Sequence, residues 1–240
     1  QTFSQRNIYV GLSGKAGTII VGKNDTPTKL AQKKIDLFGD LNGDIKNTFQ
    51  GENREDNIII YTTPKMNGFA ASIAAVASEG ETINGVNGKE DDGFDGTSFA
   101  LSYTNDDLYL SLASDNEING VDLLRAVAQY KVGDWQLGFM YQDAEAVSGS
   151  ADEDGYFVSV AYKLNSKIKL KAQYGEIDGE NSAGSDIEEE TLSLGLDYKL
   201  AKNTKLFGYY TVNTDQVKAV NSPSVETEEK TLGVGVEHKF

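Results

Sequence analysis

Apolar and polar residues alternate in short runs along most of this 240-residue chain. Alternation with a period of two is typical of β-strands that present one apolar face. The pattern predicts about thirteen strands of about nine residues each, and therefore an all-β, antiparallel protein. The predicted strands span residues 6–13, 17–23, 57–63, 69–77, 98–104, 108–114, 123–131, 135–142, 156–164, 166–175, 191–200, 204–213 and 231–240.

The connections between these strands alternate in length. Those at 14–16, 64–68, 105–107, 133–134, 165–166 and 201–203 are short, and most of the others are long, acidic and rich in glycine. Short turns at one rim and long loops at the other are typical of a transmembrane antiparallel β-barrel, and strands of about nine residues suit tilted membrane spans. The alternative is a soluble β-sandwich, whose loops have no physical reason to alternate in this way.

The stretch Asn24–Arg54 interrupts the alternation. Thr26 followed by Pro27 is typical of a helix start, and the apolar spacing predicts a short helix through about Phe38. A connection of roughly 30 residues is long for a compact β protein, which favours a functional role. Its apolar residues need a surface on which to pack. We therefore expect either a loop that folds back inside a barrel and narrows it, or an ordered surface loop.

The composition excludes several classes of function. Asp and Glu number 37 against 22 Lys and Arg, which gives a net charge of −15 and no basic footprint for nucleic acid. With no Cys, thiol catalysis and Cys-based zinc sites are excluded. The single His, His238, cannot supply a nucleophile–base pairing, so no enzyme is expected. No apolar run is long enough for a membrane-spanning helix, and Gln1 is not followed by a charged and apolar leader, so no signal peptide is expected.

Three motifs, in order along the chain, resemble Gram-negative general-diffusion porins. They are RNIYVGLSGKAGTIIVGKNDTPTKL at Arg6–Leu30, the strand at Arg54–Pro64, and the C-terminal GVGVEHKF at Gly233–Phe240. The resemblance covers essentially the whole chain. It implies a sixteen-stranded barrel, of which this chain carries about thirteen strands, so we expect residues 1–240 to be a single barrel domain that lacks its first strands.

The resemblance also implies a function and partners. Residues 24–54 match the third extracellular loop, which in the family folds into the lumen. The family forms homotrimers in the outer membrane, in contact with lipid and lipopolysaccharide, and passes ions and small hydrophilic solutes by passive diffusion. The constriction filters them by charge and size. We expect no cofactor.

Candidate pore-lining residues come from both sides of this constriction. Lys23 matches a basic position of the family, whereas Arg125, Lys167, Lys169 and Lys171 alternate with apolar residues and are therefore expected to point into the lumen. Arg54 is a weaker wall candidate. On the loop, the candidates are Lys33, Asp36, Asp40, Asp44 and Asp25. Each of these could instead only solvate the wall or the loop.

The long loops carry most of the excess negative charge and predict a weak cation preference at the outer mouth. Asp91, Asp92 and Asp95 are weak candidates for Ca²⁺ or Mg²⁺, with a solvated charge run as the alternative. Two rival functions remain at this point. One is a substrate-specific channel for sugars or phosphate, and the other is a soluble Ca²⁺-dependent β-rich binding protein.

Overall fold

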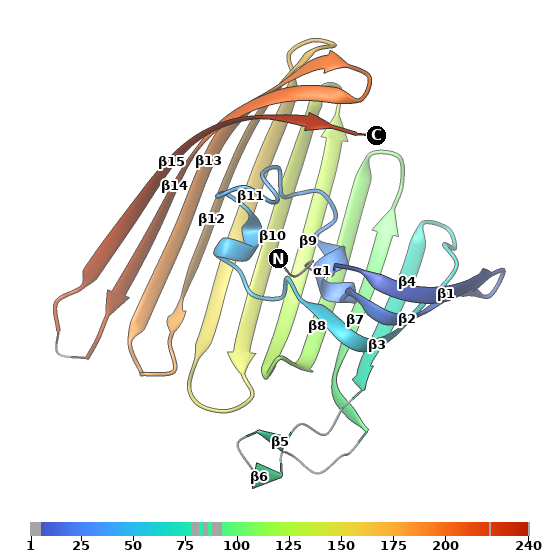
Figure 1. Cartoon of the computed structure of the whole chain (residues 1–240), viewed down its shortest axis with the longest axis vertical. Coiled ribbons are helices and arrows are strands. Elements are labelled where there is room, and N and C mark those ends of the chain that lie inside the picture. Colours follow the sequence, from blue (N-terminus) through green and yellow to red (C-terminus); the bar gives the residue numbers. More distant parts are fainter. Residues whose placement is uncertain (1–5, 78–81, 84–85, 88–92, 221, 240) are drawn as a thin grey trace.

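The computed structural model describes residues 6–77, 82–83, 86–87, 93–220 and 222–239. Thirteen strands form one antiparallel sheet, in which the strands follow one another in chain order (Figure 1). They are β1 (Ile8–Gly14), β2 (Gly17–Asp25), β3 (Arg54–Thr62), β4 (Phe69–Ala77), β7 (Phe94–Thr104), β8 (Leu108–Ile118), β9 (Val121–Val132), β10 (Trp135–Ala146), β11 (Asp152–Lys163), β12 (Ile168–Glu180), β13 (Asp186–Ala201), β14 (Thr204–Lys218) and β15 (Val225–His238). A separate small hairpin pairs β5 (Thr82–Ile83) with β6 (Val86–Asn87).

The sheet curves around residues 24–54, and β1 and β15 are its two end strands (Figure 1). The predicted strand number, order and antiparallel pairing are confirmed. The sixteen-stranded barrel that the resemblance implies stays a prediction. Among the described residues, no helix is long and apolar enough to cross a membrane.

Strands in the second half are longer than predicted. The connection expected at residues 176–190 is mostly strand, since β12 continues to Glu180 and β13 begins at Asp186. The ladder pairs Glu176 with Glu190 and Glu180 with Asp186. Backbone hydrogen bonds do not depend on apolar side chains, so pairing continues beyond the point where the apolar alternation stops.

The two faces of the sheet differ as the alternation predicts. On β13, Leu192, Leu194 and Leu196 point to the convex face and remain 40–50% exposed, while Ser193 on the other face is fully buried. Similar exposed apolar rows run along most of the other strands. An apolar surface of this extent is a lipid-facing or protein-facing surface, and it excludes the soluble sandwich, whose apolar faces would be sealed against each other.

The helix in the long loop is shorter than predicted. Its start is confirmed, because the Thr26 side chain accepts a hydrogen bond from Lys29 N–H and Pro27 occupies the first turn. However, α1 ends at Ala31 (Pro27–Ala31), and Lys33 has a positive φ of 54°. The chain leaves the helical path at this turn, and Ile35 beyond it is completely buried. A short 3-10 helix follows at Ile45–Asn47.

The main apolar core lies between the loop and the concave face of the sheet. The loop contributes Ile35, Ile45 and Phe49, and the strands β8 to β12 contribute Tyr109, Val127, Met140, Phe157 and Ile177. Ile35 and Ile45 are completely buried. The loop is therefore folded onto the inner face of the curved sheet, as predicted, and is an ordered part of its interior.

The candidate constriction site

Ion pairs join the two ends of the loop, where β2 ends and β3 begins. Asp25, the last residue of β2, lies 2.9 Å from Arg54 at the start of β3 and 3.1 Å from Lys29 in α1. The backbone N–H of Thr26 donates to the carbonyl of Asn53. These contacts hold both ends of the loop together, so Asp25 and Arg54, both predicted as pore-lining, serve the anchoring of the loop.

Arg125 of β9 fastens the last residues of the loop, just before β3, to the wall. Its side chain is completely buried and lies 2.8 Å from Glu52 of the loop. It also donates to the backbone carbonyl of Gln50 at 2.7 Å and to the side-chain oxygen of Gln142 at 2.6 Å. Arg125 is on the inner face, as predicted. However, the loop covers it, so a passing solute cannot contact it while the loop is in place.

The side chains of Glu153 and Gln50 complete this buried polar cluster. Glu153 of β11 accepts hydrogen bonds from the backbone and the side-chain amide of Gln50 and from Gln142. Burial raises the pKa of Glu52, while the Arg125 guanidinium opposes this shift. A buried charge without a partner is costly, so Arg125 and Glu52 depend on each other.

Lys171 and Gln173 of β12 fasten the part of the loop between Leu37 and Gly43 to the wall. Lys171 donates to the carbonyl of Leu37 at 3.0 Å and lies 3.0 Å from Asp197 of β13. Gln173 accepts from the backbone N–H of Leu37 at 2.9 Å and donates to the carbonyl of Gly43. Lys171 is therefore an inner-face residue, as predicted, but only a small part of it is exposed.

The acidic residues of the loop divide into two groups. Asp36 accepts hydrogen bonds from the backbone N–H groups of Phe38 and Ile45, and Asp44 caps the 3-10 helix through Lys46 N–H. Both carboxylates stabilise the folded loop from within. Asp40 is exposed and pairs with Arg6 at 3.2 Å. Of these three carboxylates, only that of Asp40 is largely open to solvent.

Asp36 gives the loop a dependence on pH. Burial, together with nearby Asp44, raises the pKa of Asp36 to about 6 from 3.8. The packed loop therefore binds this proton more tightly than an opened loop, so packing is most stable near pH 4 and weakens as the pH rises to about 6.

We expect backbone amides of the loop to be better protected from hydrogen exchange at pH 5 than at pH 7.5, after correction for intrinsic rates. The difference should shrink in Asp36→Asn, and equal protection at both pH values in the native protein would contradict this account.

The remaining lysines lie in different places. Lys23 faces Ile8 in the β1–β2 ladder, which puts it on the convex face, where it pairs with Asp56 at 2.7 Å. This corrects its predicted position in the lumen, because Lys23 follows Ile19 and Val21 at a spacing of two residues and therefore shares their outward face. Lys33 lies over the ring of Tyr109, 4.1 Å from its centroid. Lys169 is on the inner face, half-buried, and Lys167 is exposed in the short turn before β12.

The metal candidates are not brought together. Asp91 and Asp92 lie outside the described residues, and Asp95 is an exposed residue of β7. Within the part of the chain that the structure describes, no group of three acidic or histidine side chains is arranged to hold a metal ion.

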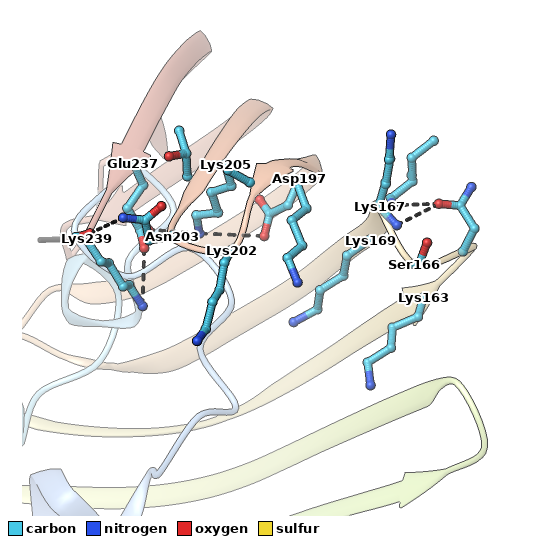
Figure 2. Close-up of a pocket in the computed structure, with 15 residues that line it drawn as sticks. Lys163, Ser166, Lys167, Lys169, Asp197, Lys202, Asn203, Lys205, Glu237 and Lys239 are labelled. Atoms are coloured by element: carbon cyan, nitrogen blue, oxygen red, sulfur yellow. Dashed lines mark hydrogen bonds and ion pairs between the residues drawn. The ribbon is translucent and has the colours of Figure 1, made fainter.

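Hollows of opposite charge lie on the two sides of the loop. On the side of the long connections, hollows of about 420 Å³ and 430 Å³ contain Lys46 together with several carboxylates, among them Glu52, Asp115, Glu153 and Glu189. On the side of the short turns, seven of the 15 residues that line a hollow of about 500 Å³ are lysines (Figure 2). A path along the inner face therefore passes from acidic to basic surroundings.

An antiparallel sheet with a lipid-type apolar exterior, a polar interior and an infolded loop defines a membrane channel of the β-barrel class. Comparison with known proteins identifies the family. The Gram-negative porin family matches residues 1–218, and the chain belongs to this family. It is accordingly an outer-membrane protein and a passive diffusion channel.

Individual relatives agree with this assignment. The chain is 25% identical to outer membrane porin protein 32 of Delftia acidovorans over 269 residues, covering 98% of this chain and 74% of the relative. Among solved structures, it is similar to an anion-selective porin from Comamonas acidovorans, with a TM-score of 0.78, 23% identity and coverage of 98% and 78% of the two chains. It is also similar to OmpF of Salmonella typhi, with a TM-score of 0.70, 15% identity and coverage of 97% and 77%.

Proposed function

We propose that this porin passes ions and small hydrophilic solutes through a lumen that the loop at residues 24–54 narrows, and that the constriction sorts them by size and charge. The observation that carries this proposal is the fastening of the loop to the inner wall at three places. The two ends of the loop are joined by Asp25 and Arg54, residues 50–52 are bound by Arg125, and the part that begins at Leu37 is bound by Lys171. A loop held in this way gives an opening of constant size.

Charge filtering rests on the exposed side chains of the loop and on the hollows beside it. Charged rings at a pore select ions through the local potential, which screening limits to about 8–10 Å at ordinary salt. Carboxylates on the side of the long connections favour cations, and lysines on the side of the short turns favour anions. We infer a weak overall ion preference, because the two regions act in opposite directions. A similar porin from Comamonas acidovorans is anion-selective, which supports a contribution of the basic region to selectivity in this chain.

A specific channel for sugars has less support. A sugar channel would need a track of aromatic side chains along the lumen. On the inner face of β14, Tyr209 donates a hydrogen bond to Asn42 of the loop, and Phe207 lies beside it. No continuous aromatic track for a sugar is formed by these two. We also infer that the protein carries out no catalysis, since members of its family act as channels.

We further infer a homotrimer that contacts outer-membrane lipid and lipopolysaccharide. The support is the extent of the exposed apolar rows and the occurrence of a trimeric form of a similar Vibrio cholerae protein, OmpT. The trimer should migrate as an oligomer in unheated detergent gels and as a monomer after boiling. A monomer under both conditions would contradict this inference.

Single-channel recording in a planar bilayer tests the diffusion function. We expect stable conductance steps in KCl and a small reversal potential in a tenfold KCl gradient, because the two charged regions oppose each other. Absence of any conductance from the folded protein would overturn the proposed function. A large reversal potential of either sign would overturn only the inferred weak preference.

A further inference from the structure

The hollow on the side of the short turns has an unusual charge for this chain. Seven lysines and two carboxylates line it, which leaves a formal excess of five positive charges in a chain whose net charge is −15. The hollow measures about 500 Å³. A concave surface of one sign focuses the electric field and concentrates ions of the opposite sign. The lysines are Lys163, Lys167, Lys169, Lys199, Lys202, Lys205 and Lys239.

Most of this positive charge is not neutralised locally. Lys205 and Lys239 pair with Glu237, and Lys205 also approaches Asp197 at 3.7 Å. Asp197 itself lies nearer to Lys171, at 3.0 Å. Among the described residues, the other five lysines of the hollow form no ion pair with a carboxylate. Figure 2 shows that the side chains of Lys163, Lys169 and Lys202 extend to the same side of the ribbon.

The hollow lies on the solute path. Its strand residues, such as Lys169, Asp197 and Lys205, occupy inner-face positions, since they alternate with the exposed leucines of β12, β13 and β14. Lys171, one inner-face position further along β12 than Lys169, contacts the loop at Leu37. The hollow is therefore next to the constriction, on the side that in outer-membrane barrels faces the periplasm.

We propose that this hollow binds small solutes that carry two or more negative charges on carboxylate or phosphate groups. The proposal rests on the diffusion function and adds a solute class to it. Several separate ammonium groups around one space favour a multivalent anion, because each added charge gains another favourable interaction while a monovalent ion gains few. Lysine binds phosphate and carboxylate as a point charge without a fixed geometry, so both groups fit the site. The volume suits a small molecule and not a polyanionic chain.

Current block in a planar bilayer tests the proposal, with citrate and pyrophosphate as the multivalent probes and acetate as the monovalent control. We expect citrate and pyrophosphate to reduce the KCl current reversibly and at lower concentration from the short-turn side. Acetate should have little effect at equal ionic strength. Block by only one of the two multivalent probes would assign the site to carboxylates or to phosphates.

Two charge-removing variants make the test specific. Lys169→Gln with Lys199→Gln removes two unpaired charges of the hollow, and we expect the half-blocking concentration to rise about fivefold. Lys218→Gln with Lys230→Gln removes the same charge near the long connections and should leave the block from the short-turn side unchanged. Normal conductance of each variant in KCl alone shows that it is folded.

The outcomes separate this proposal from the diffusion function. A channel that conducts but is not blocked by either multivalent probe, or is blocked equally in both double variants, would overturn the anion site and leave the channel function standing. A protein that does not conduct at all would overturn the channel function. Calorimetric titration of the detergent-solubilised protein with citrate then reports directly whether the hollow binds.

Discussion

Replacing Arg125 with Met should release the loop from the wall. The substitution keeps an unbranched side chain but leaves the buried Glu52 carboxylate without its guanidinium partner. It also removes one of the two donors to the Gln50 carbonyl, the other being the Gln142 side chain. Breaking one side of a buried charge pair costs about 3–5 kcal/mol. We expect hydrogen exchange of the amides near Gln50 to speed up by about a hundredfold or more, and single-channel currents to become noisy.

The partner substitution is the control for this result. In Arg125→Met with Glu52→Gln, both members of the ion pair are removed and the Glu52 charge is no longer left without its guanidinium, so the double variant should recover part of the lost protection. Equal loss in the single and the double variant would mean that the charge pair is not what holds the loop. Unchanged exchange in the single variant would contradict the role of Arg125 altogether.

A second large effect is expected from adding a side chain at Gly138, where Ile35 of the loop packs against the wall. Gly138 of β10 is on the inner face. A Cβ added there would lie nearest to the Ser159 hydroxyl of the neighbouring strand, and 2.8 Å from Cβ and 2.9 Å from Cγ2 of Ile35 in the loop. Because Ile35 is completely buried, Gly138→Val should push the loop off the wall, at a cost of about 1–3 kcal/mol. We expect a smaller and less stable single-channel conductance.

The matched control is Gly208→Val. Gly208 is also a strand glycine, but the nearest atoms to an added Cβ are 3.8 Å away. This variant should conduct like the native protein. If both glycine variants change conductance alike, the effect results from replacing a strand glycine in general and not from displacing the loop at Ile35.

The strands and the direction of their side chains could be predicted from the sequence. Period-two alternation depends only on the strand backbone and on the lipid-facing side, so Leu192 and Leu194 identify the outer face without knowledge of their neighbours. The start of α1 was equally predictable, since Thr26 and Pro27 act on the adjacent turn. The ends of the strands were not, because backbone pairing continues through acidic residues such as Glu176.

The contacts of the loop could not be predicted in the same way. Arg125 was correctly expected on the inner face, but its burial depends on Glu52 and Gln142, which are brought together only by the fold. The sequence does contain a partial signal for where the loop lies. Gly138, Gly175 and Gly195 occur at inward positions, and each leaves space for a large apolar residue of the loop, namely Ile35, Phe49 and Phe38.

Because the chain has no cysteine, one introduced thiol can report directly on whether the loop narrows the channel. Lys46 is exposed on the loop and lines both hollows on the side of the long connections. In Lys46→Cys, reaction with a bulky thiol reagent during single-channel recording should lower the conductance in discrete steps, while the same reagent on Leu194→Cys, on the lipid-facing surface, should not. An unchanged current after complete labelling of Lys46→Cys would contradict the conclusion that this loop lies across the path of the ions.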